Sequence, residues 1–143
     1  MPRYDMPKLR CELRRDEALR LVAYLCSAGK LTLGYGHTDG VQGGDTCTQE
    51  QAERWLDQDI AIAAAGLDRA LPWDWRGLSD ARQRALINMS FNLGLPRLLG
   101  FKRMLYALSI GDYPGAAAEA LNSKWAGQVG DRAARLADMI RRG

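Results

Sequence analysis

Residues 13–38 read LRRDEALRLVAYLCSAGKLTLGYGHT, and they set the secondary structure expected for the N-terminal part of the chain. The first part of this stretch is charged and amphipathic, which predicts a short helix up to about Arg20. The apolar runs LVAYLC (21–26) and LTLGYG (31–36) flank the turn-forming residues SAGK (27–30). Two such runs around a short turn predict a β-hairpin directly after the helix.

The remainder of the chain is predicted to be helical. Thr48 and Gln51 have the spacing of a capping box at the start of a helix, and the residues PWDW (72–75) interrupt the pattern. A mostly buried helix is expected over 79–93, ended by Gly94. Shorter helices are expected over 101–110, 113–121 and 132–142, with breaks over 111–112 and 127–130. The predicted fold class is α+β, mostly α.

Length and composition favour a single folded domain. The chain has 143 residues, of which 47% are hydrophobic and 26% charged, as in ordinary globular proteins. No stretch approaches the ~20 apolar residues that cross a bilayer, so no stable membrane insertion is expected. The N-terminus is charged and has no apolar core of a secretory signal, which predicts synthesis in the cytoplasm.

Metal, cofactor and nucleic-acid functions are not favoured by the sequence. The chain has one His and three Cys without a CxxC motif, so no metal site and no cofactor are expected. Cys11 and Cys47 are expected to be free thiols. The net charge is only +3, and no basic stripe alternates with aromatic residues, so no nucleic acid is expected as a partner.

Asp59 falls on the apolar stripe of the helix predicted over 48–70, at helical spacing from Trp55 and Ala63. A carboxylate at such a position needs a partner. The single histidine, His37, follows the glycine-rich second strand and is the expected partner in a structural ion pair. Such a partner is expected to lower the pKa of Asp59.

Three polar residues around the hairpin are candidates for a catalytic role. Glu17 ends the first helix, whereas Cys26 and Thr32 flank the hairpin turn, one on each strand. A carboxylic acid facing a polar pair across a groove is the geometry expected for glycoside hydrolysis. On spacing alone this signal is weak, and a solvated surface Glu is the more ordinary interpretation of Glu17. Cys26 as a small apolar residue and Thr32 as a support of the strand are the alternatives for the other two.

The quoted stretch closely resembles the N-terminal catalytic part of phage-type lysozymes, the endolysin family that includes the lysozyme of the T-even bacteriophages. Such enzymes carry Glu, eight residues, Asp or Cys, five residues and Thr, which Glu17, Cys26 and Thr32 match. The resemblance continues in RALINMSFNLG (84–94), GFKRMLYAL (100–108) and SKWAGQVGDRAARL (123–136).

The resemblance implies a two-lobed lysozyme-like fold that forms one domain over residues 1–143. A hairpin lobe (about 21–47) and a helical lobe (about 71–143, with the N-terminal helix) would be joined by a long helix (about 48–70). Peptidoglycan would lie in the cleft between the lobes.

It also implies residue roles. Glu17 would be the general acid, and Cys26 and Thr32 would position or activate the water. Arg132 aligns with an arginine that contacts the general acid in the T-even relative. The implied substrate-binding residues are Tyr24, Gly36, Asn92, Trp125, Gln128 and Arg132.

The expected function is that of an endolysin muramidase, which hydrolyses the β-1,4 bond between N-acetylmuramic acid and N-acetylglucosamine during host cell lysis. Such a monomer would act on peptidoglycan, depend on a holin, and move from the host cytoplasm to the periplasm at lysis. The alternatives are a lytic transglycosylase and a catalytically weak peptidoglycan-binding module, for example in a phage tail.

The sequence departs from the family pattern at three places. Cys26 stands where Asp is commoner, and a thiol with an ordinary pKa of ~8.5 is a poorer base than a carboxylate. The segment between His37 and Thr48 is much shorter than in the T-even enzyme, so a smaller hairpin lobe is expected. The chain ends at Gly143, so a C-terminal packing segment is expected to be missing.

Overall fold

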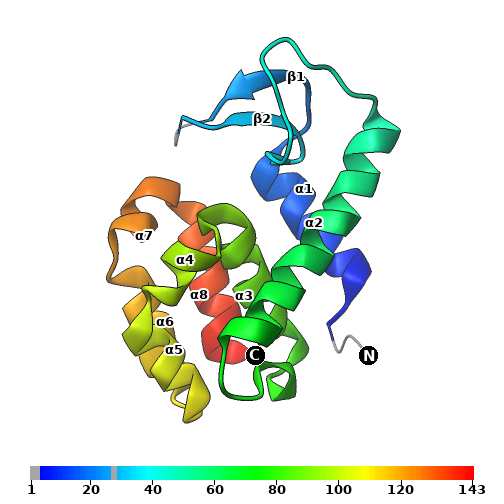
Figure 1. The fold of residues 1–143 in the computed structure, drawn as a ribbon. Coiled ribbons are helices and arrows are strands. Elements are labelled where there is room, and N and C mark those ends of the chain that lie inside the picture. Colours follow the sequence, from blue (N-terminus) through cyan, green and yellow to red (C-terminus); the bar gives the residue numbers. More distant parts are fainter. Residues whose placement is uncertain (1–3, 27–28) are drawn as a thin grey trace. The chain divides into compact units, whose positions relative to one another are not determined.

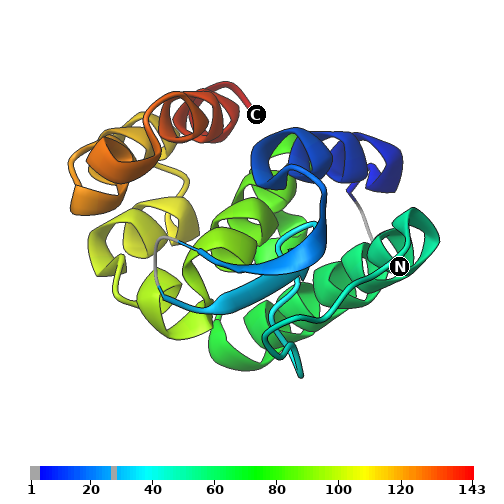
Figure 2. The same ribbon diagram turned by 90° about the horizontal axis from the view of Figure 1, so that it is seen from above.

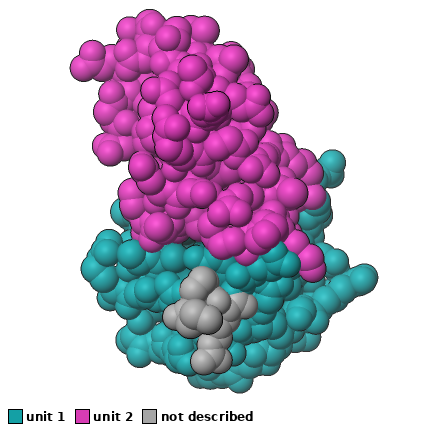
Figure 3. All heavy atoms as spheres, turned by 90° about the vertical axis from the view of Figure 1, so that its right-hand side faces the viewer, with its two compact units in different colours: residues 1–5, 63–143 teal, residues 6–62 magenta. Residues whose placement is uncertain are grey.

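The computed structural model describes residues 4–26 and 29–143, and it divides into two compact units. Figure 3 colours these units, which comprise residues 6–62 (unit 2) and residues 1–5 with 63–143 (unit 1). The structure is mostly helical and contains one small antiparallel hairpin (Figure 1), so the predicted α+β, mostly α fold class is confirmed.

Unit 2 begins with α1 (Met6–Glu17), which buries Leu9 and Leu13, one turn apart on the same face. The helix ends three residues before the predicted end at Arg20. It stops because Ala18 adopts a left-handed backbone with φ of 53°, and the Ala18 amide donates to the Arg14 carbonyl at 3.1 Å. Arg20 instead begins the first strand.

The predicted hairpin is present. Strands β1 (Arg20–Leu25) and β2 (Leu31–Gly34) pair antiparallel, with Tyr24 opposite Thr32 and an irregular register between Arg20 and Tyr24. Of the predicted turn, residues 27–28 lie outside the described part of the chain.

The second strand is shorter than the predicted 31–36, because the chain turns back on itself after Gly34. The His37 backbone amide donates to the Leu33 carbonyl at 2.9 Å, and the Leu33 amide donates to the His37 carbonyl at 2.8 Å. Gly34 and Gly36 have φ of 66° and 71°, which glycine adopts without a steric penalty. This tight turn fixes His37 beside the sheet.

A short segment also pairs with the outer edge of β1, which the sequence did not predict. Thr46 forms a bridge with Val22, the Ala23 amide donates to the Asp45 carbonyl at 2.8 Å, and the Cys47 amide donates to the Leu21 carbonyl at 3.0 Å. This pairing ties the connection before the next helix to the hairpin.

Helix α2 (Gln49–Ala70) has the predicted capping box. The backbone amide of Gln51 donates to Thr48 Oγ1, and the backbone amide of Thr48 donates to the side-chain Oε1 of Gln51. Its buried stripe is rotated slightly from the predicted one, because Trp55 and Ala63 are only half-buried. The fully buried positions are Ala52, Leu56, Ile60, Ala64 and Leu67.

Unit 1 is helical, and α8 packs against α3, α6 and α7. Figures 1 and 2 show these helices from two sides. Ser79 caps α3, and Gly94, with φ of 81°, ends it as predicted. The elements are η1 (Trp75–Gly77), α3 (Asp80–Leu93), α4 (Leu95–Leu99), α5 (Lys102–Ser109), α6 (Tyr113–Leu121), α7 (Lys124–Val129) and α8 (Asp131–Arg142).

The break predicted over 127–130 is wrong, because α7 continues through Gly127. The Ser123 hydroxyl caps this helix by accepting from the Ala126 amide at 3.1 Å, and Trp125 is buried on its first turn. Only Gly130, with φ of 53°, separates α7 from α8. Among the described residues, no helix combines the length and the apolar character that a bilayer crossing requires.

Candidate active site

Glu17 is the last residue of α1 and is half-buried. Its charge acts on the phenol of Tyr24, on β1 of the hairpin. Burial raises the pKa of Tyr24, and the negative charges of Glu17 and Cys26 raise it further, while Arg20 acts in the opposite direction. The Arg20 guanidinium lies 4.2 Å from the centre of the Tyr24 ring. Glu17 and Cys26 therefore both act electrostatically on one phenol.

Thr32 lies directly across the sheet from Tyr24, and Cys26 is diagonal to it just beyond the end of β1. The Thr32 side chain is buried, and its hydroxyl donates to the Lys30 carbonyl at 3.0 Å. A hydroxyl that donates its only proton keeps its lone pairs, so Thr32 Oγ1 can accept a hydrogen bond from water. The Cys26 amide donates to the same Lys30 carbonyl at 2.9 Å, which holds the thiol at the turn.

The proximity of Glu17 to Tyr24 is testable without any substrate. Glu17→Gln removes a negative charge that opposes phenolate formation, so the pKa of Tyr24 is expected to fall toward its usual 10. The measurement is an ultraviolet titration of phenolate absorbance in the parent and the variant. Tyr24→Phe in each background identifies the signal. The pKa of Tyr35, which burial and Glu53 raise, should not change. An unchanged Tyr24 pKa would contradict the proximity.

The expected contact between His37 and Asp59 is present. His37 Nδ1 lies 2.8 Å from Asp59 Oδ2, and both side chains are largely buried. The His37 ring also stacks on Trp55, with centroids 4.4 Å apart and an interplanar angle of 11°. The expected lowering of the Asp59 pKa is wrong, because burial raises it and outweighs the hydrogen bond and the charge of His37.

The raised pKa of Asp59 predicts how this residue affects stability at different pH values. A folded pKa above the unfolded value of 3.8 favours the protonated carboxyl on folding. Its stabilising contribution is therefore present below the unfolded pKa and is lost as the pH rises through the folded pKa. Asp59→Asn should then cost more unfolding free energy at about pH 3 than at about pH 6. Urea unfolding at both pH values measures this, and a cost that grows with pH would contradict it.

In unit 1, two asparagines one turn apart on α3 hold side chains from later helices. Asn92 Oδ1 accepts from Trp125 Nε1 at 2.7 Å, and Asn88 Oδ1 accepts from Arg132 Nε at 3.0 Å. Trp125 is 3% exposed and packs edge-on against Phe101, so its ring mainly supports Asn92. The contact expected between Arg132 and Glu17 stays a prediction.

Asn88 was not among the substrate-binding residues expected from the sequence. It is buried, and it orients the guanidinium of Arg132, which is itself 8% exposed. Its spacing of four from Asn92 was the available signal, because residues four apart share one face of a helix. Gln128 is exposed on α7, whereas Gly36 lies in the tight turn before His37, where its positive φ gives it a backbone role.

Among residues 4–26 and 29–143, no three His, Cys, Asp or Glu side chains gather closely enough to hold a metal ion. Cys11 and Cys47 are free thiols, and burial raises the pKa of Cys47. The chemistry available around the hairpin is thus that of a carboxylic acid with a phenol, a thiol and a hydroxyl. A carboxylic acid beside water-binding groups is an arrangement suited to glycoside hydrolysis.

Comparison with known proteins supports this class. A family model described as phage lysozyme matches residues 14–142. The chain is 39% identical to an endolysin of Acyrthosiphon pisum secondary endosymbiont phage 1, over 91% of this chain and 86% of that protein. It is 32% identical to the endolysin of Salmonella phage P22, over 83% of this chain and 82% of that protein. It is 29% identical to the pre-baseplate central spike protein Gp5 of Enterobacteria phage T4, over 90% of this chain but 26% of that protein.

The chain therefore belongs to the phage lysozyme family, a family of glycoside hydrolases that degrade bacterial cell walls. The family resemblance seen in the sequence is confirmed.

Proposed function

We propose that this protein is an endolysin muramidase. It hydrolyses the β-1,4 bond between N-acetylmuramic acid and N-acetylglucosamine in peptidoglycan, for host cell lysis. It acts as a monomer, reaches the periplasm from the host cytoplasm and depends on a holin to do so. The observation that carries the proposal is the placement of Glu17 at the end of α1, directly before a hairpin that carries Thr32 opposite Tyr24, in a chain of the phage lysozyme family.

In this proposal Glu17 is the general acid and protonates the glycosidic oxygen as the bond breaks. Thr32 Oγ1, which already donates to a backbone carbonyl, accepts a hydrogen bond from the attacking water. The Cys26 thiol holds the same water from the end of the strand. The water adds to the anomeric carbon and releases a proton to solvent, and solvent returns a proton to Glu17.

Residues of unit 1 would contribute sugar contacts. The Asn92 carbonyl oxygen is occupied by Trp125, so its amide group remains as a donor for a sugar substituent. Gln128 is exposed and Arg132 is oriented by Asn88, which suits them to bind polar groups of the glycan. Tyr24 would line the glycan beside Glu17.

One observation favours a second candidate, a lytic transglycosylase. A transglycosylase needs the acid but no group that activates water, and this chain has Cys26 where a carboxylate is commoner in the family. The two reactions leave different ends, since hydrolysis gives a reducing sugar whereas transglycosylation gives a 1,6-anhydro sugar.

The test is a turbidity assay on purified peptidoglycan, followed by mass spectrometry of the soluble products. A falling turbidity with reducing-end muropeptides is expected. Anhydro products would establish the transglycosylase. Binding to peptidoglycan without any release of products would instead indicate a wall-binding module.

A further inference from the structure

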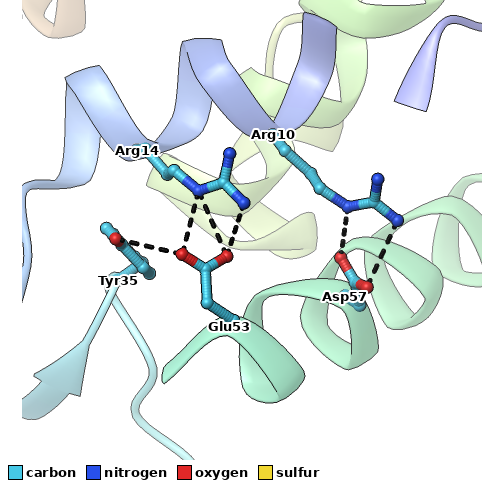
Figure 4. Close-up of polar contacts among 5 residues, drawn as sticks. All are labelled: Arg10, Arg14, Tyr35, Glu53 and Asp57. Atoms are coloured by element: carbon cyan, nitrogen blue, oxygen red, sulfur yellow. Dashed lines mark hydrogen bonds and ion pairs between the residues drawn. The ribbon is translucent and has the colours of Figure 1, made fainter. Parts of the chain in front are cut away.

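Two ion pairs join α1 to α2 within unit 2, and Figure 4 shows both. Arg10 Nε lies 2.7 Å from Asp57 Oδ1, and Arg10 Nη2 lies 3.3 Å from Asp57 Oδ2. One turn later along α1, Arg14 binds Glu53 through Nε, 3.1 Å from both carboxylate oxygens, and through Nη2 at 2.5 Å. Both contacts are arginine–carboxylate pairs between the same two helices, so they can be compared directly.

The Arg14–Glu53 pair, nearer the C-terminal end of α1, has more hydrogen-bond partners than the Arg10–Asp57 pair. The hydroxyl of Tyr35, in the turn after β2, donates to Glu53 Oε1 at 3.3 Å, so one carboxylate joins both helices and the hairpin. The hydrogen bonds and charge of Glu53 raise the pKa of Arg14, and burial together with Glu53 raises the pKa of Tyr35. The Arg14 guanidinium is therefore charged, and the Tyr35 phenol is neutral, where both contact the Glu53 carboxylate.

Arg14 also lies one turn before Glu17, the candidate acid. Its carbonyl accepts from the amide of Ala18, the residue that ends the helix in a left-handed conformation. Ala18 is the one non-glycine residue with positive φ in the described part of the chain. A strained backbone of this kind persists where the surrounding contacts over-determine it. The Arg14 side chain thus links the last turn of α1 to α2. The backbone of that turn sets the direction of the Glu17 side chain.

We propose that Glu53, acting through Arg14, is a positioning residue that fixes the last turn of α1 and with it the carboxyl group of Glu17. The inference rests on the proposed role of Glu17 as the acid. It assigns to the pair a function beyond stability, since partly exposed ion pairs contribute little to the stability of a fold.

Asp57 provides the matched control. Its pair with Arg10 joins the same two helices one turn further from Glu17, and among residues 20–26 and 29–37 of the hairpin no side chain is bonded to it. The side chains of the two pairs are similarly exposed, at 31% and 48% for Arg10 and Asp57, and 36% and 32% for Arg14 and Glu53. Neutralising either acid therefore removes an ion pair of similar exposure, and Glu53→Gln also changes the acceptor of the Tyr35 hydroxyl.

The experiment compares the full-length parent with Glu53→Gln and Asp57→Asn, by kcat and KM of peptidoglycan lysis and by thermal unfolding. Glu53→Gln is expected to lower kcat about tenfold with little change in KM, within the ~10²-fold that a misplacement of about 1 Å can cost. Asp57→Asn should retain the parental kcat. Both variants should lower the unfolding temperature by small amounts, and Glu53→Gln by the larger, because Glu53 also binds Tyr35. Arg14→Lys, which keeps the charge but loses the two-pronged contact, should resemble Glu53→Gln.

A second measurement follows the position of Glu17 without using activity. The carboxyl-carbon resonance of Glu17, assigned by its loss in Glu17→Gln, should shift in Glu53→Gln and not in Asp57→Asn. Equal effects of the two variants on kcat and on this resonance, or no effect of either, would overturn the inference. If the parent does not lyse peptidoglycan, the proposed function fails, and the resonance alone decides whether Glu53 positions Glu17.

Discussion

Glu17→Gln is expected to lower the rate of peptidoglycan lysis by about 10²- to 10⁴-fold, the usual contribution of a general acid. The amide matches the carboxyl in size but cannot donate a proton to the glycosidic oxygen. The fold should persist, because Glu17 is the last residue of α1 and is not one of the residues that this helix buries, Leu9 and Leu13. Initial rates of turbidity loss, with circular dichroism of the same samples, measure both properties.

Glu50→Gln is the control for Glu17→Gln, since Glu50 is an exposed carboxylate in the first turn of α2. It should lyse peptidoglycan as fast as the parent. A folded Glu17→Gln protein with near-parental lysis would remove Glu17 from the catalytic role and leave the proposed mechanism without its acid.

Bulky alkylation of Cys26 is expected to lower lysis by about 10²-fold, because in the proposed mechanism the added group would displace the water that the thiol holds. The reaction is best done in a Cys11→Ser/Cys47→Ser background, which leaves one thiol to modify and should itself be active. Cys26→Ala should lower the rate less than alkylation does. Cys26→Asp should keep or raise the rate, because a carboxylate is a competent base near neutral pH.

The unmodified Cys26→Ala protein is also the control for the reagent, which should not change its activity. Two results together would reduce Cys26 to a packing role: parental activity in Cys26→Ala, and no inhibition after complete alkylation shown by mass spectrometry. Thr32 would then be the remaining group on the hairpin that can hold the water.

Elements with a strong local pattern could be predicted from the sequence. The turn formers between two apolar runs predicted the hairpin, and the spacing of Thr48 and Gln51 predicted the start of α2, because both signals depend on neighbouring residues. Pairing of Thr46 with Val22 could not be predicted, since residues 45–47 follow a run of turn formers and pair only once the hairpin exists. The end of α7 was also missed, because the burial of Trp125 and the cap at Ser123 outweigh the glycine at 127.

In the candidate site too, features that depend on neighbouring residues could be predicted, whereas features that depend on the finished fold could not. Glu17, Cys26 and Thr32 surround one hairpin, so their arrangement follows from local structure, and the partner of Asp59 followed from the single histidine. The direction of the Asp59 pKa did not follow, because it depends on how deeply the finished fold buries the carboxyl. The contact of Asn88 with Arg132 joins residues 44 positions apart, which only the packing of α8 on α3 brings together.

The pairing of His37 with Leu33, and of Thr46 with Val22, has a consequence for how family members can diverge. These contacts close the intervening loop at both ends, and Gly40 and Gly44 within it turn the chain in left-handed conformations with open space around them. Each doubling of a flexible loop costs only ~0.6 kcal/mol of closure entropy. The loop can therefore change in length at little cost while both strands keep their register.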